Sequence, residues 1–434
     1  MRKNSLWRSK RLDFDRCFGV KLTLGKSFYS STQNKLNPPL AISSKFQTVS
    51  QITYLGVDVI LSGTGTRPRA KERLQHLKDR CHLIAKLKSP VRGKLVADAV
   101  SALWMDGGAW YAKAELDTAT SSTAMALRGH DDGYAGQRCR DVEHMLSFKA
   151  HRTHPRLAAM ISTLRLVAQL TALTQWDSIR WDELWARRFR ARSGPLAQSW
   201  HHFKYTSVTW DTPLEVAHRS PGKTLTCKVE LHINKSQQAA YWHDVRELLR
   251  TSLWNKIAID RPKDFSGLED GIGFRETIQS MFHTKGAPSV LCGGMWTMMN
   301  AYLANLSDES ICPRCFLEPE TTEHRLWECP CGRQERDGLL ETLPGLDYTQ
   351  LPNCLRRCGL PPANFHEQLE LSPLPIFHYL IKQNLCATAA FLDVKRLQQL
   401  TSQGGACAGH RSAPGILGIL TTSSASRPPD GRHH

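Results

Sequence analysis

The sequence lacks the features of membrane and secreted proteins. Its 434 residues contain no apolar run of about 18 residues, the length that a membrane-spanning helix requires. The N-terminal residues lead into charged sequence without the apolar segment of a signal peptide. We therefore expect an intracellular protein with no membrane partner. In a reducing compartment its 13 scattered cysteines are expected to be free or to bind metal rather than to form disulfides.

Common catalytic motifs are also missing. The sequence has no Gly-x-Ser-x-Gly, no His-Glu-x-x-His, no dinucleotide-binding glycine fingerprint and no internal repeat. Gly19–Ser27 is close to a phosphate-binding P-loop, but five residues instead of four separate its glycines. His130-Asp131-Asp132 offers the paired carboxylates that hold divalent ions, yet its glycine-rich surroundings favour a solvated turn. We assign no catalytic residue.

Acidic residues are scarce where basic residues are dense. The chain has 57 Lys and Arg against 40 Asp and Glu, which gives a formal charge of +17. Residues 1–100 contain 20 of the basic residues and only 6 of the acidic ones. A basic block that is also rich in apolar residues is typical of a folded surface for a polyanion, most often nucleic acid. The alternative is a basic surface that only keeps the protein soluble.

The most informative stretch is residues 310–331. It contains the spacing C-x2-C-x8-H-x4-C, formed by Cys312, Cys315, His324 and Cys329. Three thiolates and one imidazole are the ligands of a closed tetrahedral site, so we expect structural Zn²⁺. Thr321 or Thr322 is expected to cap a short helix that carries the last two ligands. Cys331 is an alternative to Cys329, and a second metal site at Cys354 and Cys358 stays open.

The hydrophobic pattern predicts an α+β fold that is mostly α-helical. Gln51–Leu61, with β-branched and aromatic residues in near-alternation, is expected to be a strand, and residues 223–234 one or two more. Helices are expected at 67–88, 91–105, 155–174, 181–192, 237–259 and 373–400. Residues 115–140 are expected to form a loop or short helices, residues 193–221 a loop, and residues 351–362 turns. The Gly-, Ser- and Pro-rich tail from residue 401 is expected to be disordered.

The helix expected at residues 67–88 is amphipathic. Its apolar residues recur at three- and four-residue spacing and form one buried stripe: Leu74, Leu77, Cys81 and Ile84. Much of the remaining surface is basic and suits contacts with phosphates: Arg67, Arg69, Lys71, Arg73, Lys78, Arg80, Lys86 and Lys88. An ordinary solvated helix face is the alternative.

The order of these segments resembles the C-terminal part of the reverse transcriptase polyprotein of non-LTR (LINE-like) retrotransposons. Phe18–Ser27 is similar to the palm segment G-x-x-L-N-x-x-K-[ST], with Thr23 in place of Asn and Lys26 at the lysine near the nucleotide phosphates. Ile52–Val57 resembles the YLG strand of the primer grip, and residues 310–331 resemble the C-terminal CCHC zinc knuckle. The resemblance spans about residues 16–331.

The resemblance implies six segments and a set of nucleic-acid contacts. The segments are a palm remnant (1–66), a basic helical thumb (67–115), a helical linker (116–305), a zinc knuckle (306–335), a helical C-terminal segment (336–400) and a disordered tail (401–434). The thumb would contact a primer–template duplex, and the knuckle would contact RNA through Arg314, Arg325 and Trp327. Element RNA and target DNA are the implied partners, and the nucleus the implied location.

The carboxylates of the family's polymerase site would precede Gly19, where the only acidic residues are Asp13 and Asp15. Without converging carboxylates two Mg²⁺ ions cannot be held, so Mg²⁺ is expected only in the full-length parent enzyme. We therefore expect a truncated fragment of an RNA-directed DNA polymerase that binds nucleic acid without synthesising it. The alternatives are a stand-alone zinc-dependent RNA- or DNA-binding protein without enzymatic activity, and the unfolded product of a decayed element.

Overall fold

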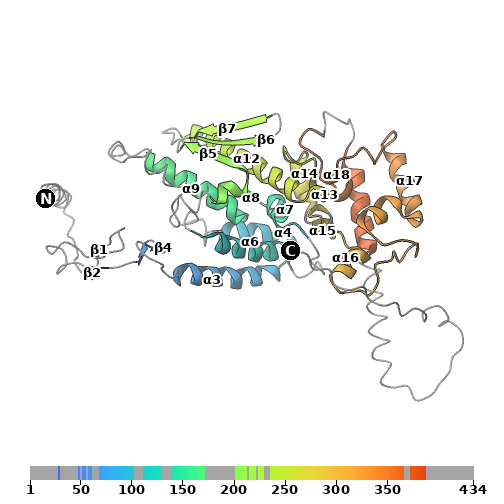
Figure 1. The fold of residues 1–434 in the computed structure, drawn as a ribbon, viewed down its shortest axis with the longest axis horizontal. Helices are drawn as coiled ribbons and strands as arrows, with labels where there is room; N and C mark the ends of the chain where they lie inside the picture. The colour runs from blue at the N-terminus through green and yellow to red at the C-terminus, as the bar shows by residue number, and fades with distance from the viewer. Residues whose placement is uncertain are drawn as a thin grey trace, which may run out of the picture. The chain divides into compact units, whose positions relative to one another are not determined.

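The computed structural model describes most of the chain between residues 68 and 387. The described residues are 28–29, 47–48, 51–54, 57–60, 68–101, 111–129, 138–171, 201–212, 215–220, 223–228, 235–365 and 372–387. They form an α+β fold that is mostly α-helical, as the sequence predicts (Figure 1). Contacts gather Met1–Leu385 into one compact unit and Cys386–His434 into a second.

The N-terminal strands are short. β1 (Phe28–Tyr29) pairs in parallel with β2 (Gln47–Thr48), and β3 (Gln51–Tyr54) pairs antiparallel with β4 (Val57–Ile60). The prediction of a single strand over Gln51–Leu61 is wrong, because the chain reverses between Tyr54 and Val57. The connection contains Gly56, a residue type that favours tight turns.

The helices that follow the strands are α3 (Pro68–Ala85), α4 (Ser89–Leu95), η2 (Val96–Val100), α6 (Lys113–Arg128), α7 (Arg140–Leu146), α8 (Ala150–Thr153) and α9 (Pro155–Thr171). Most of them pack around two small cores, while α7 and α8 contribute Val142, Met145, Leu146 and Ala150 to the largest core. The predicted helices at 67–88 and 155–174 are confirmed. α3 packs its predicted stripe against α6, with Leu77, Cys81 and Ile84 buried. No described helix is both long and apolar enough to cross a membrane.

Helix α6 corrects the prediction of a loop or short helices at 115–140. Its sequence is rich in Ala, Ser and Thr, so its hydrophobic periodicity is weak. The side chains of these residues are small and allow close packing against α3. Hydroxyl groups on five polar positions donate to the carbonyl oxygen one turn earlier, at 2.7–2.9 Å: Thr118, Thr120, Ser121, Ser122 and Thr123. These bonds satisfy the hydroxyl groups, so the polar side chains of α6 can be buried although the helix has no continuous hydrophobic stripe.

A three-stranded antiparallel sheet covers α12 (Lys235–Asp260). The strands β5 (Val208–Thr212), β6 (Glu215–Ser220) and β7 (Lys223–Lys228) lie in sequence order. β5 and β6 fall in the region predicted as loop, 193–221, where turn residues mask two short strands. The predicted stripe of α12 is confirmed, since Trp242, Val245, Leu248, Leu249 and Leu253 are all buried.

The C-terminal part of the described chain surrounds the largest core. Its elements are α13 (Pro262–Phe265), α14 (Arg275–Met281), α15 (Ala287–Leu291), α16 (Met298–Leu303), η5 (His324–Glu328), η6 (Pro330–Gly332), α17 (Arg333–Thr342) and α18 (Asn353–Cys358). Residues 374–387 are helical, within the predicted helix 373–400. The core extends from Val142 to Ile381 and includes Leu326 and Trp327 of the metal-binding segment.

Several predictions concern residues outside the described ranges. They are the palm segment with Lys26, the first thumb residue Arg67, the turn His130-Asp131-Asp132, the helix at 181–192 and the tail 401–434.

Candidate metal centre

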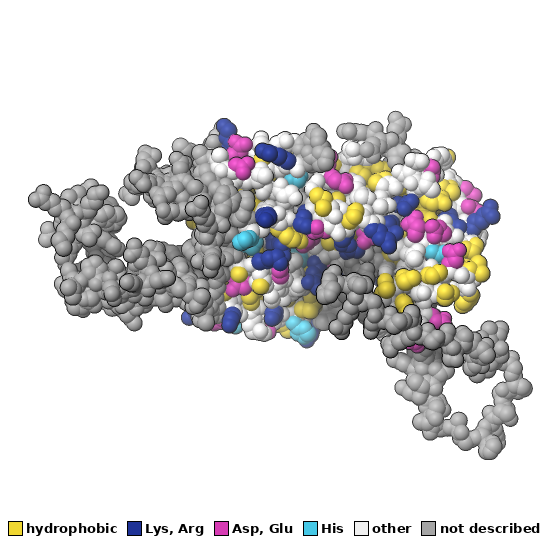
Figure 2. Space-filling model, viewed as in Figure 1, with side chains coloured by type: hydrophobic (Ala, Val, Ile, Leu, Met, Phe, Trp, Pro, Cys, Tyr) yellow, Lys and Arg dark blue, Asp and Glu magenta, His cyan; other side chains and the backbone are white. Residues whose placement is uncertain are grey.

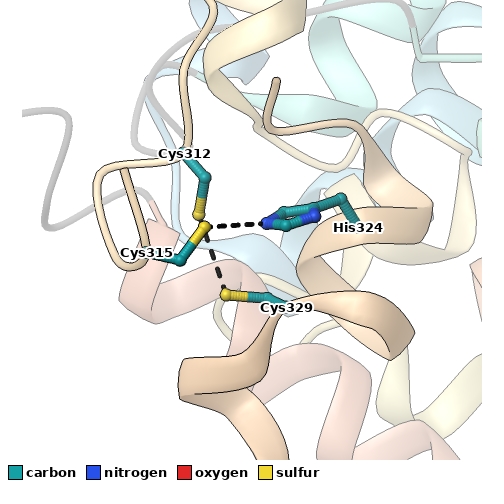
Figure 3. A group of neighbouring side chains, drawn as sticks. All are labelled: Cys312, Cys315, His324 and Cys329. Carbon is teal, nitrogen blue, oxygen red and sulfur yellow. Dashed lines mark hydrogen bonds between the residues drawn. The ribbon is translucent and has the colours of Figure 1, made fainter. Parts of the chain in front are cut away.

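The four residues predicted from the spacing lie together in the fold. One ligand atom from each of Cys312, Cys315, His324 and Cys329 can be chosen so that all four lie within 4.8 Å of one another (Figure 3). The Sγ atoms of Cys312 and Cys329 are 3.9 Å apart, and Cys315 Sγ lies 3.3 Å from His324 Nε2. Three of the four side chains are buried and Cys315 is half-buried. The group can therefore hold a metal ion.

The first two ligands lie on a tight loop. Cys312 N donates to Glu318 O at 2.8 Å and closes the loop. Inside it, the backbone of Arg314 and Cys315 favours ionisation of the Cys312 thiol, and the backbone of Leu317 and Glu318 favours ionisation of the Cys315 thiol, so that each lowers the pKa of its neighbour.

The other two ligands come from a short helix and its C-terminal end. Thr321 Oγ1 accepts from His324 N at 3.0 Å, so Thr321 is the cap that the sequence predicts. The next turn, η5, is a π-turn, closed by Cys329 N donating to His324 O at 2.6 Å. A π-turn is wider than an α-turn and brings residues five apart onto one side of the helix. His324 and Cys329 therefore both face the loop of Cys312 and Cys315 (Figure 3).

The three thiols differ in acidity. Burial raises the pKa of Cys312 to about 12, with Glu320 and Cys329 adding to the rise. Burial also opposes ionisation of Cys315, but the amides of Leu317 and Glu318 and the contact with His324 outweigh it and lower its pKa to about 7. Cys315 can therefore ionise near neutral pH without a metal. Ionisation of all three adjacent thiols requires a cation between them.

Glu318 supplies an outer contact to the imidazole. Its Oε2 lies 3.3 Å from His324 Nδ1, on the opposite side of the ring from Cys315. His324 Nδ1 forms no hydrogen bond, so the contact is one of proximity and does not select the tautomer of the ring.

Arg325, predicted to contact nucleic acid, has a structural role instead, and that prediction is wrong. Only 1 % of its side chain is exposed, and its guanidinium forms a buried ion pair with Glu320. Arg325 Nε also donates to Gln383 O at 3.1 Å, and Glu320 Oε2 accepts from Met298 N at 2.8 Å. The pair joins the metal-binding loop to α16 and to the helix at 374–387, where RNA cannot reach it.

Trp327 and Arg314, the other two residues predicted to contact RNA, also interact with the rest of the protein. Trp327 is buried and stacks on Tyr348 with ring centroids 4.9 Å apart. Arg314 is half-buried and donates to Cys331 O and to Gln383 Oε1, each at 3.0 Å. The exposed apolar residues at this end of the loop are Phe316 and Leu317, 76% and 73% exposed. The sequence analysis did not single out these two exposed apolar residues, although an apolar pair directly after a metal ligand can be seen in the sequence.

The other cysteines that the structure describes do not join the cluster. Among the described residues, no second group of three or more His, Cys, Asp or Glu side chains is arranged to hold a metal ion. Cys331, the predicted alternative ligand, is exposed and its thiol donates to Arg314 O at 3.1 Å. Cys354 and Cys358 are buried in the large core, where burial raises the pKa of both thiols. They act as small apolar side chains.

The basic residues of the predicted thumb lie on and after α3. Those that the structure describes as exposed are Arg69, Lys71, Lys78, Arg80, Lys86 and Lys88, while Arg73 is half-buried. Two acidic residues interrupt the surface: Glu72, paired with Arg69 at 2.7 Å, and Asp79. Arg80 also donates to Ala99 O at 3.0 Å. The surface is accessible and keeps a net positive charge.

No family model, no curated protein and no solved structure matches the chain. The resemblance to retrotransposon reverse transcriptases therefore remains a prediction from the sequence motifs.

Proposed function

We propose that this protein binds nucleic acid and that a structural zinc ion holds the loop of residues 310–331 in its fold. The observation that carries the proposal is the convergence of three cysteines and one histidine on a single point. All four coordination positions of a tetrahedral ion would be filled by protein, which leaves none for a substrate and favours a structural role.

Zinc is the metal that best suits this group. Mixed thiolate and imidazole ligands favour Zn²⁺ over Mg²⁺ or Ca²⁺, which prefer oxygen. With Zn–S bonds of about 2.3 Å and Zn–N bonds of about 2.0 Å, tetrahedral geometry separates two sulfurs by about 3.8 Å and a sulfur from a nitrogen by about 3.5 Å. The separations of 3.9 Å between Cys312 and Cys329, and 3.3 Å between Cys315 and His324, fit these edges.

Nucleic-acid binding is supported by the accessible cations of α3 and the residues after it. Lysine and arginine side chains that project from one helix contact phosphates without reading base sequence. Because such contacts release counterions, the affinity should fall steeply as salt concentration rises. Cations that only solubilise the protein would produce no such binding.

The test combines metal analysis with a salt titration. Elemental analysis should find one zinc per chain. The variant with Arg69, Arg73, Lys78 and Arg80 changed to Gln should bind duplex more weakly, with a salt slope smaller by about 0.9 for each phosphate that is no longer neutralised. The control replaces Arg333 and Lys263, exposed cations outside α3, by Gln. Absence of zinc, or a slope unchanged from the wild type, would contradict the respective half of the proposal.

We also infer descent from the C-terminal part of a non-LTR retrotransposon reverse transcriptase, supported by the order of the motifs at 18–27, 52–57 and 310–331. The inferred present activity is binding rather than DNA synthesis. Primer extension by the purified chain with Mg²⁺ tests this point, and sustained extension would contradict it.

A further inference from the structure

A second cation-rich surface lies far along the chain from α3. A cavity of about 680 Å³ opens between the α7–α8 connection, α12 and α14, and its lining includes Phe148, Lys149, Arg246, Arg250, Phe274 and Arg275. Figure 2 shows Lys and Arg side chains gathered with hydrophobic ones across the middle of one face, near where α7 and α8 lie in Figure 1. Its size is that of a ligand-binding pocket.

The lining carries more positive than negative charge. Its four cations, Lys149, Arg246, Arg250 and Arg275, face only two carboxylates, Glu247 and Glu276. Glu247 is shared, because Arg250 lies 2.5 Å and Arg275 3.3 Å from its oxygens. One carboxylate cannot neutralise two guanidinium groups, so the cleft keeps a positive field that favours an anion.

Two further arginines outside the lining add to this field. Partial burial lowers the pKa of Arg165, whose side chain is still exposed, and repulsion from Arg246 and Arg152 lowers it further. Arg152 has a carboxylate partner in Asp98, at 3.5 Å, but the three guanidinium groups still repel one another. Like charges held together without a ligand are costly, and an anion in the cleft would relieve the repulsion.

Aromatic side chains line the same cleft. Phe148 is 45% exposed, with Lys149 Nζ 4.9 Å from its ring centroid. Phe274 is held edge-on by Phe365, with ring centroids 6.3 Å apart. Lys149 and Phe274 both have left-handed backbones, with φ of 51° and 48°. Such strain in non-glycine residues is concentrated at binding sites, and here two strained positions line one cleft.

We propose that this cleft binds single-stranded nucleic acid, with its lysine and arginines contacting phosphates and the Phe148 ring stacking on a base. Cationic grooves that carry exposed aromatic rings bind unpaired strands in this way. A duplex is a poorer fit, because its bases already stack on one another and do not offer a free face to Phe148. The inference rests on the proposed nucleic-acid function and assigns it a site distinct from α3.

The experiment measures binding of fluorescein-labelled oligo(rU), oligo(dT) and a hairpin duplex, each of about 15 nucleotides, by anisotropy over a range of salt. Phe148→Leu keeps an apolar side chain but removes the aromatic face. It should weaken binding of single strands about tenfold and leave the duplex unchanged. Lys149→Gln with Arg246→Gln should reduce the single-strand salt slope by about 1.4. The control is Lys263→Gln with Arg333→Gln, which should change neither quantity.

The outcomes separate this inference from the proposed function. If both cleft variants bind single strands normally and the α3 variant loses nucleic-acid binding, the cleft is not the binding site but the proposed function stands. No nucleic-acid binding by the wild type would overturn both. A smaller salt slope with no effect of Phe148→Leu would indicate a phosphate pocket without stacking and also overturn the inference. The rU and dT arms distinguish an RNA site from a DNA site.

Photocrosslinking of the wild-type chain keeps the test valid if a cleft variant does not fold. An oligonucleotide containing 4-thiouridine should crosslink to peptides that contain residues 148–151 or 274–279. Crosslinks confined to peptides from α3 would overturn the inference.

Discussion

Arginine has opposite roles in two regions of this protein. In the metal-binding segment, Arg325 is buried and paired with Glu320, and Arg314 is held by backbone and side-chain oxygens. On α3, Arg69 and its basic neighbours project into solvent beside a buried stripe. Both regions are rich in positive charge, and the sequence alone led us to expect both to contact nucleic acid.

The difference arises from what each segment packs against. The metal-binding segment adds Leu326 and Trp327 to the largest core, and its charged side chains are drawn in with them. A guanidinium taken out of water must be compensated, and Glu320 and the carbonyl of Gln383 provide the compensation. Helix α3 buries only one side, so its charged residues stay hydrated. Accessible charge, rather than total charge, is therefore the better guide to a candidate surface for a polyanion.

Removal of the metal ligands should have the largest effect and should be confined to one of the two regions. Cys312→Ser with Cys315→Ser should abolish zinc binding and reduce the free energy of unfolding by about 5 kcal/mol or more, because structural zinc contributes folding energy directly. Hydrogen exchange should show reduced protection in residues 310–331 and retained protection in α3 and α6. The matched control is Cys331→Ser, which should keep the zinc. An unchanged zinc content in the double variant would contradict the ligand assignment.

Breaking the buried ion pair should come next. Arg325→Met leaves the Glu320 carboxylate buried without its partner, which should cost about 3–5 kcal/mol in chemical denaturation. Nucleic-acid affinity of the folded variant should not change, because the side chain is inaccessible. Arg333→Met, at a side chain that is 83% exposed, should cost less than about 0.5 kcal/mol. A loss of affinity without a loss of stability would reverse the roles assigned to the two kinds of arginine.

The smallest expected effect concerns a buried histidine outside the metal cluster. Burial, with repulsion from His154, lowers the pKa of His144 to about 3, whereas unfolded histidine titrates near pH 6.5. Protonation therefore favours the unfolded chain, so the contribution of His144 to stability is complete above about pH 6.5 and decreases as pH falls toward 3.

Between pH 7 and pH 5 this loss should be about 1–2 kcal/mol. His144→Gln should reduce the pH dependence of unfolding by that amount, and replacement of the exposed His82 by Gln should not. Acid also protonates the metal ligands, but it does so equally in all three proteins, so the comparison isolates His144. Equal pH dependence in the wild type and His144→Gln would contradict the assignment.

Sequence by itself determined the features that depend on local spacing. The four metal ligands were predicted because a loop, a capped turn and fixed intervals suffice to specify them, and the cap at Thr321 was among the alternatives. The stripes of α3 and α12 were predicted because each buries one face and so leaves a helical period in the sequence.

Only the tertiary structure decided which polar and charged side chains became buried. Helix α6 has no strong hydrophobic period, because its hydroxyls bond to its own backbone and its small residues pack against α3. Arg325 is inaccessible because Glu320 and Gln383, from separate parts of the chain, meet it in the core. The cleft beside Phe148 joins residues about 130 positions apart. For these polar and charged side chains, burial depends on contacts between distant segments, which the local sequence pattern does not encode.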